Sequence, residues 1–171
     1  MYNKPLIVLA IMFGFMALFS NCGTPKKGDM APDFETILID GSDFKLSDLQ
    51  GNYVILDFWG SWCGPCRTET PKLVSLYSKY KGKKFSDADD IYVVSVALEK
   101  NDKSWKLVAD KLGIDWKHQV VEKAKFVRFS NLAQKYNVTD IPSKFLISPK
   151  GELLPQNTIG GIDKYLSERI K

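Results

Sequence analysis

The chain has 171 residues, of which 44% are hydrophobic and 26% charged, the composition of an ordinary globular protein. This length is enough for one domain that buries its own core without additional cross-links. The formal net charge is +4, and one of the positive charges, Lys4, lies in a segment that we expect to be removed, so the excess is too small to indicate a nucleic-acid partner.

The first 21 residues have the features of an export signal. Lys4 supplies a positive charge, and residues 6–19 form an unbroken apolar stretch. Spanning a bilayer takes about 20 apolar residues, so this stretch is shorter than a typical transmembrane helix. We therefore expect residues 1–21 to be a signal peptide, with an uncleaved N-terminal anchor as the alternative.

Cys22 is the candidate lipidation site. Residues 18–22, Leu-Phe-Ser-Asn-Cys, resemble a bacterial lipobox, although Phe19 stands where Leu is usual and Asn21 where Gly or Ala is. Lipidation would leave one cysteine pair and no stray thiol, which suits an oxidising compartment. We expect residues 22–29 to be a tether and the protein to face the periplasm, anchored by its lipid to the inner or outer membrane. A cleaved signal that leaves Cys22 unmodified is the other interpretation.

Residues 30–171 form the expected domain, in which strand and helix patterns alternate. Continuous apolar runs rich in β-branched residues predict buried strands, and apolar residues spaced three and four apart predict helices. The predicted elements in chain order are a hairpin of strands 34–39 and 44–46 around Asp40-Gly41, a strand at 53–59, a helix at 63–80, a strand at 91–98, a helix at 105–112 ending at Gly113, a strand at 118–121, a helix at 130–136, a strand at 145–147, a turn at 148–151 leading into an extended segment at 152–154, and a last helix carrying Ile162, Tyr165, Leu166 and Ile170. This alternation predicts an α/β fold with helices on both faces of one sheet.

Residues 62–66, Trp-Cys-Gly-Pro-Cys, lie where a predicted strand turns into a predicted helix. The N-terminus of a helix carries partial positive charge and unpaired backbone N–H groups, which stabilise a thiolate. Pro65 suits the first turn of a helix, where its missing N–H is not needed. Cys63, expected to be partly exposed, is the predicted nucleophile, and Cys66, one turn further, is the predicted resolving thiol.

A C-x-x-C pair can also be half of a zinc site or a structural disulfide. A zinc site needs a second pair of ligands, and the chain offers only Cys22 and His118. A disulfide that closes so short a loop removes little entropy from the unfolded chain, which disfavours a purely structural role. We therefore interpret Cys63 and Cys66 as a redox-active pair and expect neither a metal nor another cofactor.

Residues 57–66, Asp-Phe-Trp-Gly-Ser-Trp-Cys-Gly-Pro-Cys, resemble the active-site segment of the thioredoxin superfamily. Residues 31–34, Ala-Pro-Asp-Phe, and residues 46–51, Leu-Ser-Asp-Leu-Gln-Gly, are similar to its membrane-anchored TlpA/ResA-like branch, and the resemblance extends over about residues 30–170. It implies a thioredoxin fold, with a central mixed sheet and helices on both faces. It also implies an N-terminal β-hairpin and an inserted strand–helix segment after the strand at 91–98.

Two acids accompany the cysteines. Asp57 is the one charged residue of an apolar strand, where burial would raise the pKa of its carboxyl. Its position six residues before Cys63 matches the buried acid of thioredoxin, which implies that it accepts the proton of Cys66. Glu69, three residues after Cys66, matches an acid that tunes the thiols in TlpA/ResA-like proteins. A locally hydrogen-bonded Asp57 and a surface Glu69 at the helix start are the alternatives, and the division of labour between the acids stays open.

Ile141-Pro142 is the second predicted part of the site. Only about 5–6% of X–Pro bonds in folded proteins are cis. The matching proline of the thioredoxin superfamily is cis and faces the dithiol, so the resemblance implies a cis bond here and substrate binding by the backbone of Ile141. Trp62, Gly64 and Pro65 would complete this substrate-binding surface, with the Trp62 ring as an apolar platform unless it serves only packing.

These features predict an exported thiol–disulfide oxidoreductase that works by exchange through Cys63 and Cys66. Gly64-Pro65 resembles thioredoxin rather than the strongly oxidising members, so we expect a reductant that is recharged by a membrane electron donor. The expected clients are disulfide-containing envelope proteins, with apocytochrome c as one candidate.

Two other functions remain as alternatives. The segment Ala31-Pro32-Asp33-Phe34 also opens many thiol peroxidases, but these need Thr or Ser three residues before the reactive cysteine, whereas Ser61 lies two before Cys63. Copper-binding assembly factors of the same fold use C-x-x-x-C with a distal histidine, and the spacing here is one residue shorter.

Overall fold

The computed structural model of the chain describes residues 25–100 and 104–171, so the predicted signal peptide and Cys22 lie outside the described residues. The elements are β1 (Glu35–Ile37), β2 (Asp43–Lys45), the 3-10 helix η1 (Leu46–Leu49), β3 (Tyr53–Trp59), α2 (Gly64–Tyr80), β4 (Ile91–Glu99), α3 (Trp105–Leu112), β5 (His118–Lys123), the 3-10 helix η2 (Val127–Phe129), α4 (Asn131–Lys135), β6 (Ser143–Ile147) and α5 (Ile159–Ser167). Among the described residues, no helix is long and apolar enough to cross a membrane.

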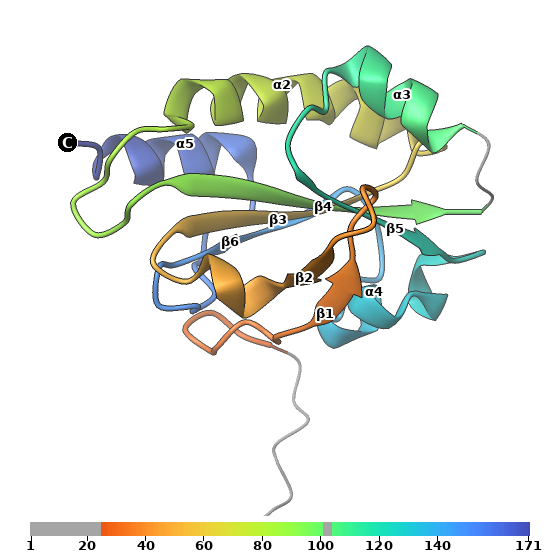
Figure 1. Cartoon of the computed structure of the whole chain (residues 1–171), viewed down its shortest axis with the longest axis horizontal. Helices are drawn as coiled ribbons and strands as arrows, with labels where there is room; N and C mark the ends of the chain where they lie inside the picture. The colour runs from red at the N-terminus through yellow and green to blue at the C-terminus, as the bar shows by residue number, and fades with distance from the viewer. Residues whose placement is uncertain (1–24, 101–103) are drawn as a thin grey trace, which may run out of the picture.

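Four strands form the central sheet in the order β5-β4-β3-β6 (Figure 1). β4 pairs in parallel with β3 and β5, whereas β6 runs antiparallel to β3. The sheet is therefore mixed, as predicted. All seven residues of β3 are buried, because this central strand is covered on both faces.

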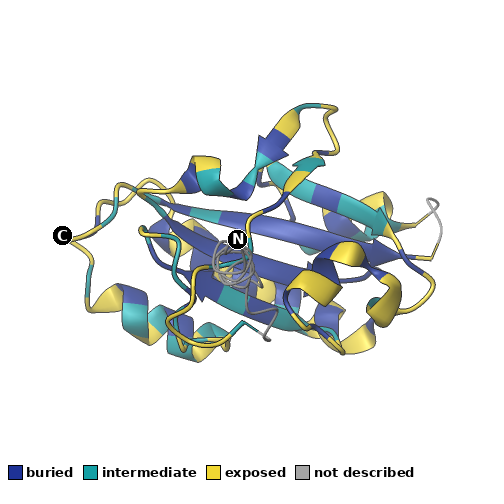
Figure 2. Ribbon diagram, turned by 90° about the horizontal axis from the view of Figure 1, so that it is seen from below, coloured by how far each residue is buried: buried dark blue, intermediate teal, exposed yellow. Residues whose placement is uncertain are grey.

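Helices and the hairpin cover the two faces of the sheet. In Figure 1, α2, α3 and α5 lie on one face, and α4 and the β1–β2 hairpin lie on the other. Successive residues of β3 point to opposite faces. Ile55 and Trp59 therefore pack in the core under α2 and α5, and Leu56 and Phe58 pack in the core under the hairpin and α4. Figure 2 shows the resulting pattern, with buried strands between helices whose outer faces are exposed.

The N-terminal hairpin is present as a separate two-stranded antiparallel sheet. Its first strand is shorter than predicted and its second begins one residue earlier, at Asp43. The turn between them begins at Leu38, whose N–H donates a hydrogen bond of 2.9 Å to the carbonyl of Ser42. Gly41 has a φ of 84°, a conformation that favours glycine. The Asp40 carboxylate accepts hydrogen bonds from the N–H and the hydroxyl of Ser42 and so stabilises the turn.

The predicted insertion after β4 consists of α3 and β5. β5 pairs with the outer side of β4, so the insertion supplies an edge strand of the central sheet. α3 ends where predicted, at Gly113, which has a φ of 76° and whose N–H contacts the carbonyls of Ala109 and Asp110.

The prediction for the last helix is wrong at its end. α5 stops at Ser167, and Ile170 lies beyond it in an isolated bridge with Phe85. Backbone hydrogen bonds from Ser86 to Arg169 and from Lys171 to Lys84 hold the chain end in this extended conformation.

The predicted extended segment at 152–154 forms isolated bridges instead of a continuous strand. Leu153 forms an isolated bridge with Ile147 of β6. The N–H of Leu153 donates a hydrogen bond to the carbonyl of Asp29, and the carbonyl of Leu153 accepts one from the N–H of Gly28. The end of the predicted tether therefore packs along this segment.

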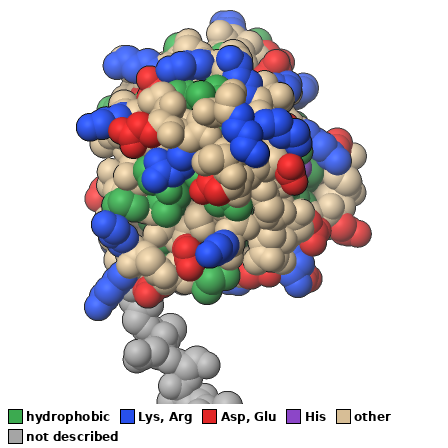
Figure 3. Space-filling view, turned by 90° about the vertical axis from the view of Figure 1, so that its left-hand side faces the viewer, with side chains coloured by type: hydrophobic (Ala, Val, Ile, Leu, Met, Phe, Trp, Pro, Cys, Tyr) green, Lys and Arg blue, Asp and Glu red, His purple; other side chains and the backbone are tan. Residues whose placement is uncertain are grey.

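The surface carries both signs of charge. On the face shown in Figure 3, Lys and Arg side chains lie among Asp and Glu side chains. Such mixing weakens any long-range field from this face.

Candidate active site

The two cysteines lie at the start of α2, directly after β3. Residues 60–63 form a turn that is closed by a hydrogen bond of 3.0 Å from the N–H of Cys63 to the carbonyl of Gly60. Cys63 is the N-cap of α2, and its sulfur accepts a hydrogen bond of 3.1 Å from the N–H of Cys66. A disulfide joins the two cysteines, with 2.09 Å between the Sγ atoms. The pair is therefore oxidised, at a helix end that would stabilise a thiolate on reduction.

Cys63 is less exposed than the sequence predicts. Only 5% of the residue is exposed, and its disulfide partner is 1% exposed. The expectation of partial exposure is wrong because the turn directs the sulfur inward, where Sγ lies 3.6 Å from the carbonyl oxygen of Ile141. The exposed part of the motif is Trp62, Gly64 and Pro65, with Pro65 in the first turn of α2.

The peptide bond between Ile141 and Pro142 is cis, as the resemblance implies. It lies just before β6, which pairs with β3 at the edge of the sheet. The Ser143 hydroxyl donates a hydrogen bond of 2.6 Å to the carbonyl of Asp140 and closes the loop around the proline. The fold thereby brings the Ile141 carbonyl to Cys63, although the two residues are 78 positions apart.

The end of β4 holds the turn that precedes Cys63. The Glu99 carboxylate accepts hydrogen bonds of 2.6 Å and 2.8 Å from the N–H and the hydroxyl of Ser61. The indole Nε1 of Trp62 donates a hydrogen bond of 2.7 Å to the carbonyl of Leu98, and Nζ of Lys100 lies 4.6 Å from the centroid of the Trp62 ring. Glu99 is 2% exposed, and its role could not be predicted, because no local pattern places the end of β4 beside this turn.

A buried lysine joins the two predicted acids. β6 is antiparallel to β3 with Lys144 directly opposite Asp57, so the two side chains share a face of the sheet. Nζ of Lys144 lies 3.1 Å from Oδ1 of Asp57 and donates a hydrogen bond of 2.9 Å to Oε2 of Glu69 on α2. The exposed fractions of the side chains are 2% for Asp57, 4% for Lys144 and 31% for Glu69. Lys144 was missed because the predicted strand starts at residue 145, whereas β6 starts two residues earlier, at Ser143. A lysine beside an apolar run was the available signal.

Burial and the neighbouring ammonium act in opposite directions on Asp57. Desolvation raises the pKa of Asp57 above its ordinary value, and the positive charge of Lys144 only partly offsets this. Nζ lies 3.1 Å from Oδ1, so the ammonium is the close partner of this buried carboxylate. Desolvation lowers the pKa of Lys144, but the two carboxylates outweigh it, so the net shift of the Lys144 pKa is upward. The cluster therefore combines a stable cation with a carboxylate that readily takes a proton.

Comparison with known proteins places this site in a family. Residues 27–154 match the AhpC/TSA family. The chain is 32% identical over 156 residues to the thiol-disulfide oxidoreductase ResA of Oceanobacillus iheyensis, covering 86% of this chain and 73% of that protein. It is 31% identical over 152 residues to ResA of Geobacillus kaustophilus, covering 86% and 80%. The chain belongs to the AhpC/TSA family.

The solved structures agree with this assignment. The thioredoxin domain of a thiol-disulfide oxidoreductase from Bacteroides vulgatus has a TM-score of 0.68 to this chain at 25% identity, covering 82% of this chain and 98% of that chain. This AhpC/TSA-family protein is thus a thioredoxin-fold thiol–disulfide oxidoreductase of the TlpA/ResA-like type. Its C-x-x-C pair is joined as a disulfide.

His118 of this AhpC/TSA-family protein serves packing. It lies in β5, with its ring centroid 5.1 Å from that of Phe44 and 5.5 Å from that of Tyr92. Burial lowers the pKa of His118. The ring thus joins the hairpin to the sheet.

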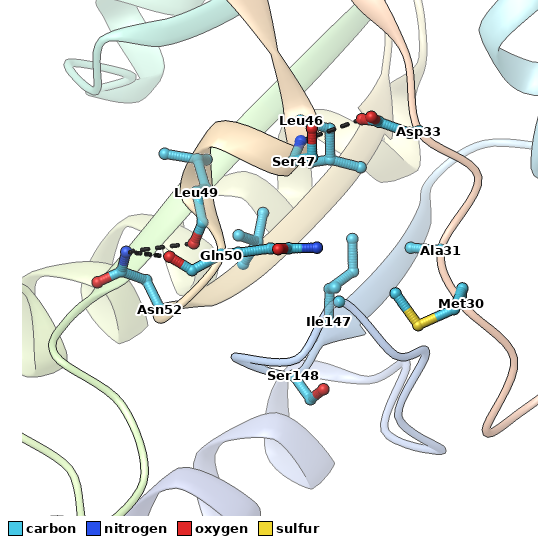
Figure 4. Close-up of a pocket in the computed structure, with 12 residues that line it drawn as sticks. Met30, Ala31, Asp33, Leu46, Ser47, Leu49, Gln50, Asn52, Ile147 and Ser148 are labelled. Atoms are coloured by element: carbon cyan, nitrogen blue, oxygen red, sulfur yellow. Dashed lines mark hydrogen bonds between the residues drawn. The ribbon is translucent and has the colours of Figure 1, made fainter.

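A pocket of about 270 Å³ lies at the other end of β3 (Figure 4). Val54 and Ile147, which pair between β3 and β6, line it together with Met30 and Gln50, whose side chain extends across it. Because Val54 is near the start of β3 and Cys63 follows its end, the pocket is separate from the disulfide.

Proposed function

We propose that the chain is an exported enzyme that reduces disulfides in proteins of the cell envelope. The signal-like residues 1–21 and the lipobox-like segment around Cys22 support export and a lipid anchor in the inner or outer membrane, with the domain facing the periplasm. The strongest support for a disulfide client is the contact of 3.6 Å between the Cys63 sulfur and the carbonyl of Ile141, next to the cis proline.

In the first step, the thiolate of Cys63 in the reduced enzyme attacks a sulfur of the client disulfide. A mixed disulfide forms between Cys63 and the client, and the other client sulfur leaves as a thiolate. The N-terminus of α2 and the N–H of Cys66, which already bonds to Cys63 Sγ, favour this thiolate.

In the second step, Cys66 resolves the mixed disulfide. Asp57 takes the proton of the Cys66 thiol, the new thiolate attacks Cys63 Sγ, and the second client sulfur leaves. Asp57 suits this role because it is buried in the same core as Cys66, and because burial makes the carboxyl a better base. Glu69 acts on the same step through its contact with Lys144.

The client chain is proposed to bind across the loop at Ile141 and Pro142. The Ile141 backbone would pair with the extended client segment, as an added strand pairs with a sheet edge. Trp62, which is 42% exposed, and the exposed Gly64 and Pro65 form the other side of this surface.

A reductant in an oxidising compartment needs a source of electrons, which we propose to be a membrane electron donor. Each turnover leaves the enzyme as the disulfide, and the donor must supply two electrons to restore both thiols. A reduction potential near that of thioredoxin, about −270 mV, supports this direction, whereas a value near that of a strong oxidant, about −120 mV, would reverse it.

The test is to trap the clients in the envelope. In a strain expressing Cys66→Ser, the mixed disulfide cannot be resolved, so clients should accumulate on Cys63 and be released by reductant. The matched control is the double variant Cys63→Ser with Cys66→Ser, which should trap none. Apocytochrome c among the trapped proteins would support that client. An absence of trapped envelope proteins, despite normal expression, would contradict the proposed function.

A further inference from the structure

Lys144 is a buried cation beside the disulfide. A buried ammonium must be paired with opposite charge to remain ionised. The charged groups that act on it are Asp57 from β3 and Glu69 from α2, and the charged groups that act on Asp57 are Lys144 and Glu69. The three side chains therefore form one cluster, which carries a net charge of −1 when all are ionised and is neutral when one acid is protonated.

We propose that Lys144 is a positioning residue for the resolving step: Glu69 anchors its ammonium against Asp57, and the ammonium keeps Asp57 available as the carboxylate that takes the proton of Cys66. This inference rests on the proposed function and assigns different tasks to the two acids. Asp57 is the base, and Glu69 holds the cation that the base needs.

Strand geometry places the base on the correct face. Side chains alternate along β3, so Asp57 points to the same face as Ile55 and Trp59. Those two residues pack in the core cluster that contains Cys66. The antiparallel register sets Lys144 opposite Asp57 on this same face, below α2, which carries Glu69.

The contacts differ in a way that fits the two tasks. Lys144 donates a hydrogen bond of 2.9 Å to Glu69, which is partly exposed, and its ammonium lies 3.1 Å from Oδ1 of Asp57, which is buried. The hydrogen bond to Glu69 fixes the position of the ammonium, and the ion pair with Asp57 stabilises the ionised form of the buried carboxyl. The attraction of Lys144 for ionised Asp57 exceeds the repulsion from Glu69, so the net effect of the two neighbours favours the carboxylate.

The protons and electrons of the step balance. The Cys66 thiol gives its proton to Asp57, and the cluster becomes neutral. The Cys66 thiolate forms the bond to Cys63 Sγ as the client sulfur leaves with its electron pair. The proton on Asp57 is later lost to water, and the cluster returns to its charge of −1.

The experiment uses the reduced enzyme and dithiobis(nitrobenzoate), whose coloured thiolate is released once when Cys63 attacks and once when Cys66 resolves. In Lys144→Met, desolvation acts on Asp57 without the opposing cation, so the pH midpoint of the second release should move upward. A shift of one pH unit corresponds to an about tenfold slower second release below the midpoint. The first release should change little. If the pH profile of the second release in Lys144→Met matched that of the wild type, the inference would be overturned.

Two comparisons separate this effect from a general one. Lys79→Met removes an exposed lysine of α2 that pairs with Asp163 at 2.6 Å, and its profile should match the wild type. Lys144→Met leaves Asp57 buried without a cation and can therefore fail to fold, so Asp57→Asn is compared with Asp57→Asn/Lys144→Met, in which no buried carboxylate is left unpaired. In the Asp57→Asn background, the added loss of Lys144 should change the rate of the second release by less than about twofold. A further tenfold loss in the double variant would overturn the inference.

Failure of the proposed function gives a different result. If the wild-type enzyme shows no second release, Cys66 does not resolve and the proposed mechanism fails as a whole. If the wild type resolves and Lys144→Met behaves identically, only the assignment of Lys144 fails.

Discussion

Cys63 is both the N-cap of α2 and one half of the disulfide. Its sulfur already accepts the N–H of Cys66, so reduction creates the thiolate where a hydrogen-bond donor and the helix dipole are in place. The turn before α2 directs that sulfur inward, where it lies 3.6 Å from the carbonyl oxygen of Ile141. The Cys63 sulfur is therefore contacted both by its own helix and by the distant proline loop.

The buried carboxyl of Asp57 should reduce the stability of the folded protein. Burial raises the pKa of Asp57, so the unfolded chain releases this proton at a lower pH than the folded one. Wild-type stability should decline as the pH rises from the unfolded pKa of about 3.9 toward the higher folded pKa. Asp57→Asn removes this titration, so its thermal midpoint should rise relative to wild type across that interval and stay level above it. A difference in thermal midpoint between Asp57→Asn and wild type that does not vary with pH would contradict the raised pKa of Asp57.

The end of β4 acts as a support for the active-site turn. Leu98, Glu99 and Lys100 each contact Ser61 or Trp62, so one strand end positions both the residues before Cys63 and the indole beside it. Gly60 fits this arrangement closely: a Cβ there would lie 2.9 Å from the Trp62 Nε1 and 3.0 Å from the Leu98 carbonyl. The central sheet thus sets the geometry of the turn directly.

Glu99→Ala should therefore affect both stability and thiol chemistry. Two buried donors of Ser61 would lose their acceptor, which costs about 1–3 kcal/mol of unfolding free energy. The loosened turn should also change the rate of Cys63 alkylation severalfold, measured with iodoacetamide on the reduced enzyme.

Glu122→Ala is the matched control for Glu99. Its carboxylate accepts hydrogen bonds from the Ser130 hydroxyl and the Asn131 N–H at the start of α4, away from the cysteines. Unfolding free energy should fall in this variant while Cys63 alkylation stays at the wild-type rate. Equal rates of Cys63 alkylation in Glu99→Ala and Glu122→Ala would show that Glu99 does not influence the reactivity of Cys63.

The whole molecule is a sheet with a core on each face, and the disulfide lies at one end of it. The core under α2 and α5 includes Cys63 and Cys66, so the packing of the helices against the sheet and the placement of the redox pair depend on each other. The hairpin and α4 close the other core, which contains none of the predicted catalytic residues.

Ile162 tests how much the packing of α5 contributes. It is fully buried against the sheet, so Ile162→Ala should lower the free energy of unfolding by about 2–5 kcal/mol, measured by urea denaturation. Ile37→Ala in the hairpin is the control with the same chemistry, because Ile37 is 56% exposed, and it should change stability by less than about 0.5 kcal/mol. Similar losses in both variants would show that the hairpin is packed more tightly than this exposure indicates.

Features with a local cause could be predicted from the sequence. The apolar runs predict β3 and β4 because a strand covered on both faces needs apolar residues in succession, and Asp40-Gly41 predicts the hairpin because its turn needs a residue with positive φ. The boundaries of the last helix and of β6 were missed. The bridge between Phe85 and Ile170 and the pairing of β6 with β3 from Ser143 onward, rather than local periodicity, decide these boundaries.

The amino-acid sequence by itself determined the alternation of strands and helices, the C-x-x-C pair at a helix start and, through its resemblance, the thioredoxin fold. Only the tertiary structure decided that Lys144 meets Asp57 and Glu69, and that Glu99 holds Ser61. The physical reason is that these contacts depend on strand register and on which ends of the sheet meet. Those relations join residues far apart in the chain, and no periodicity within one segment encodes them.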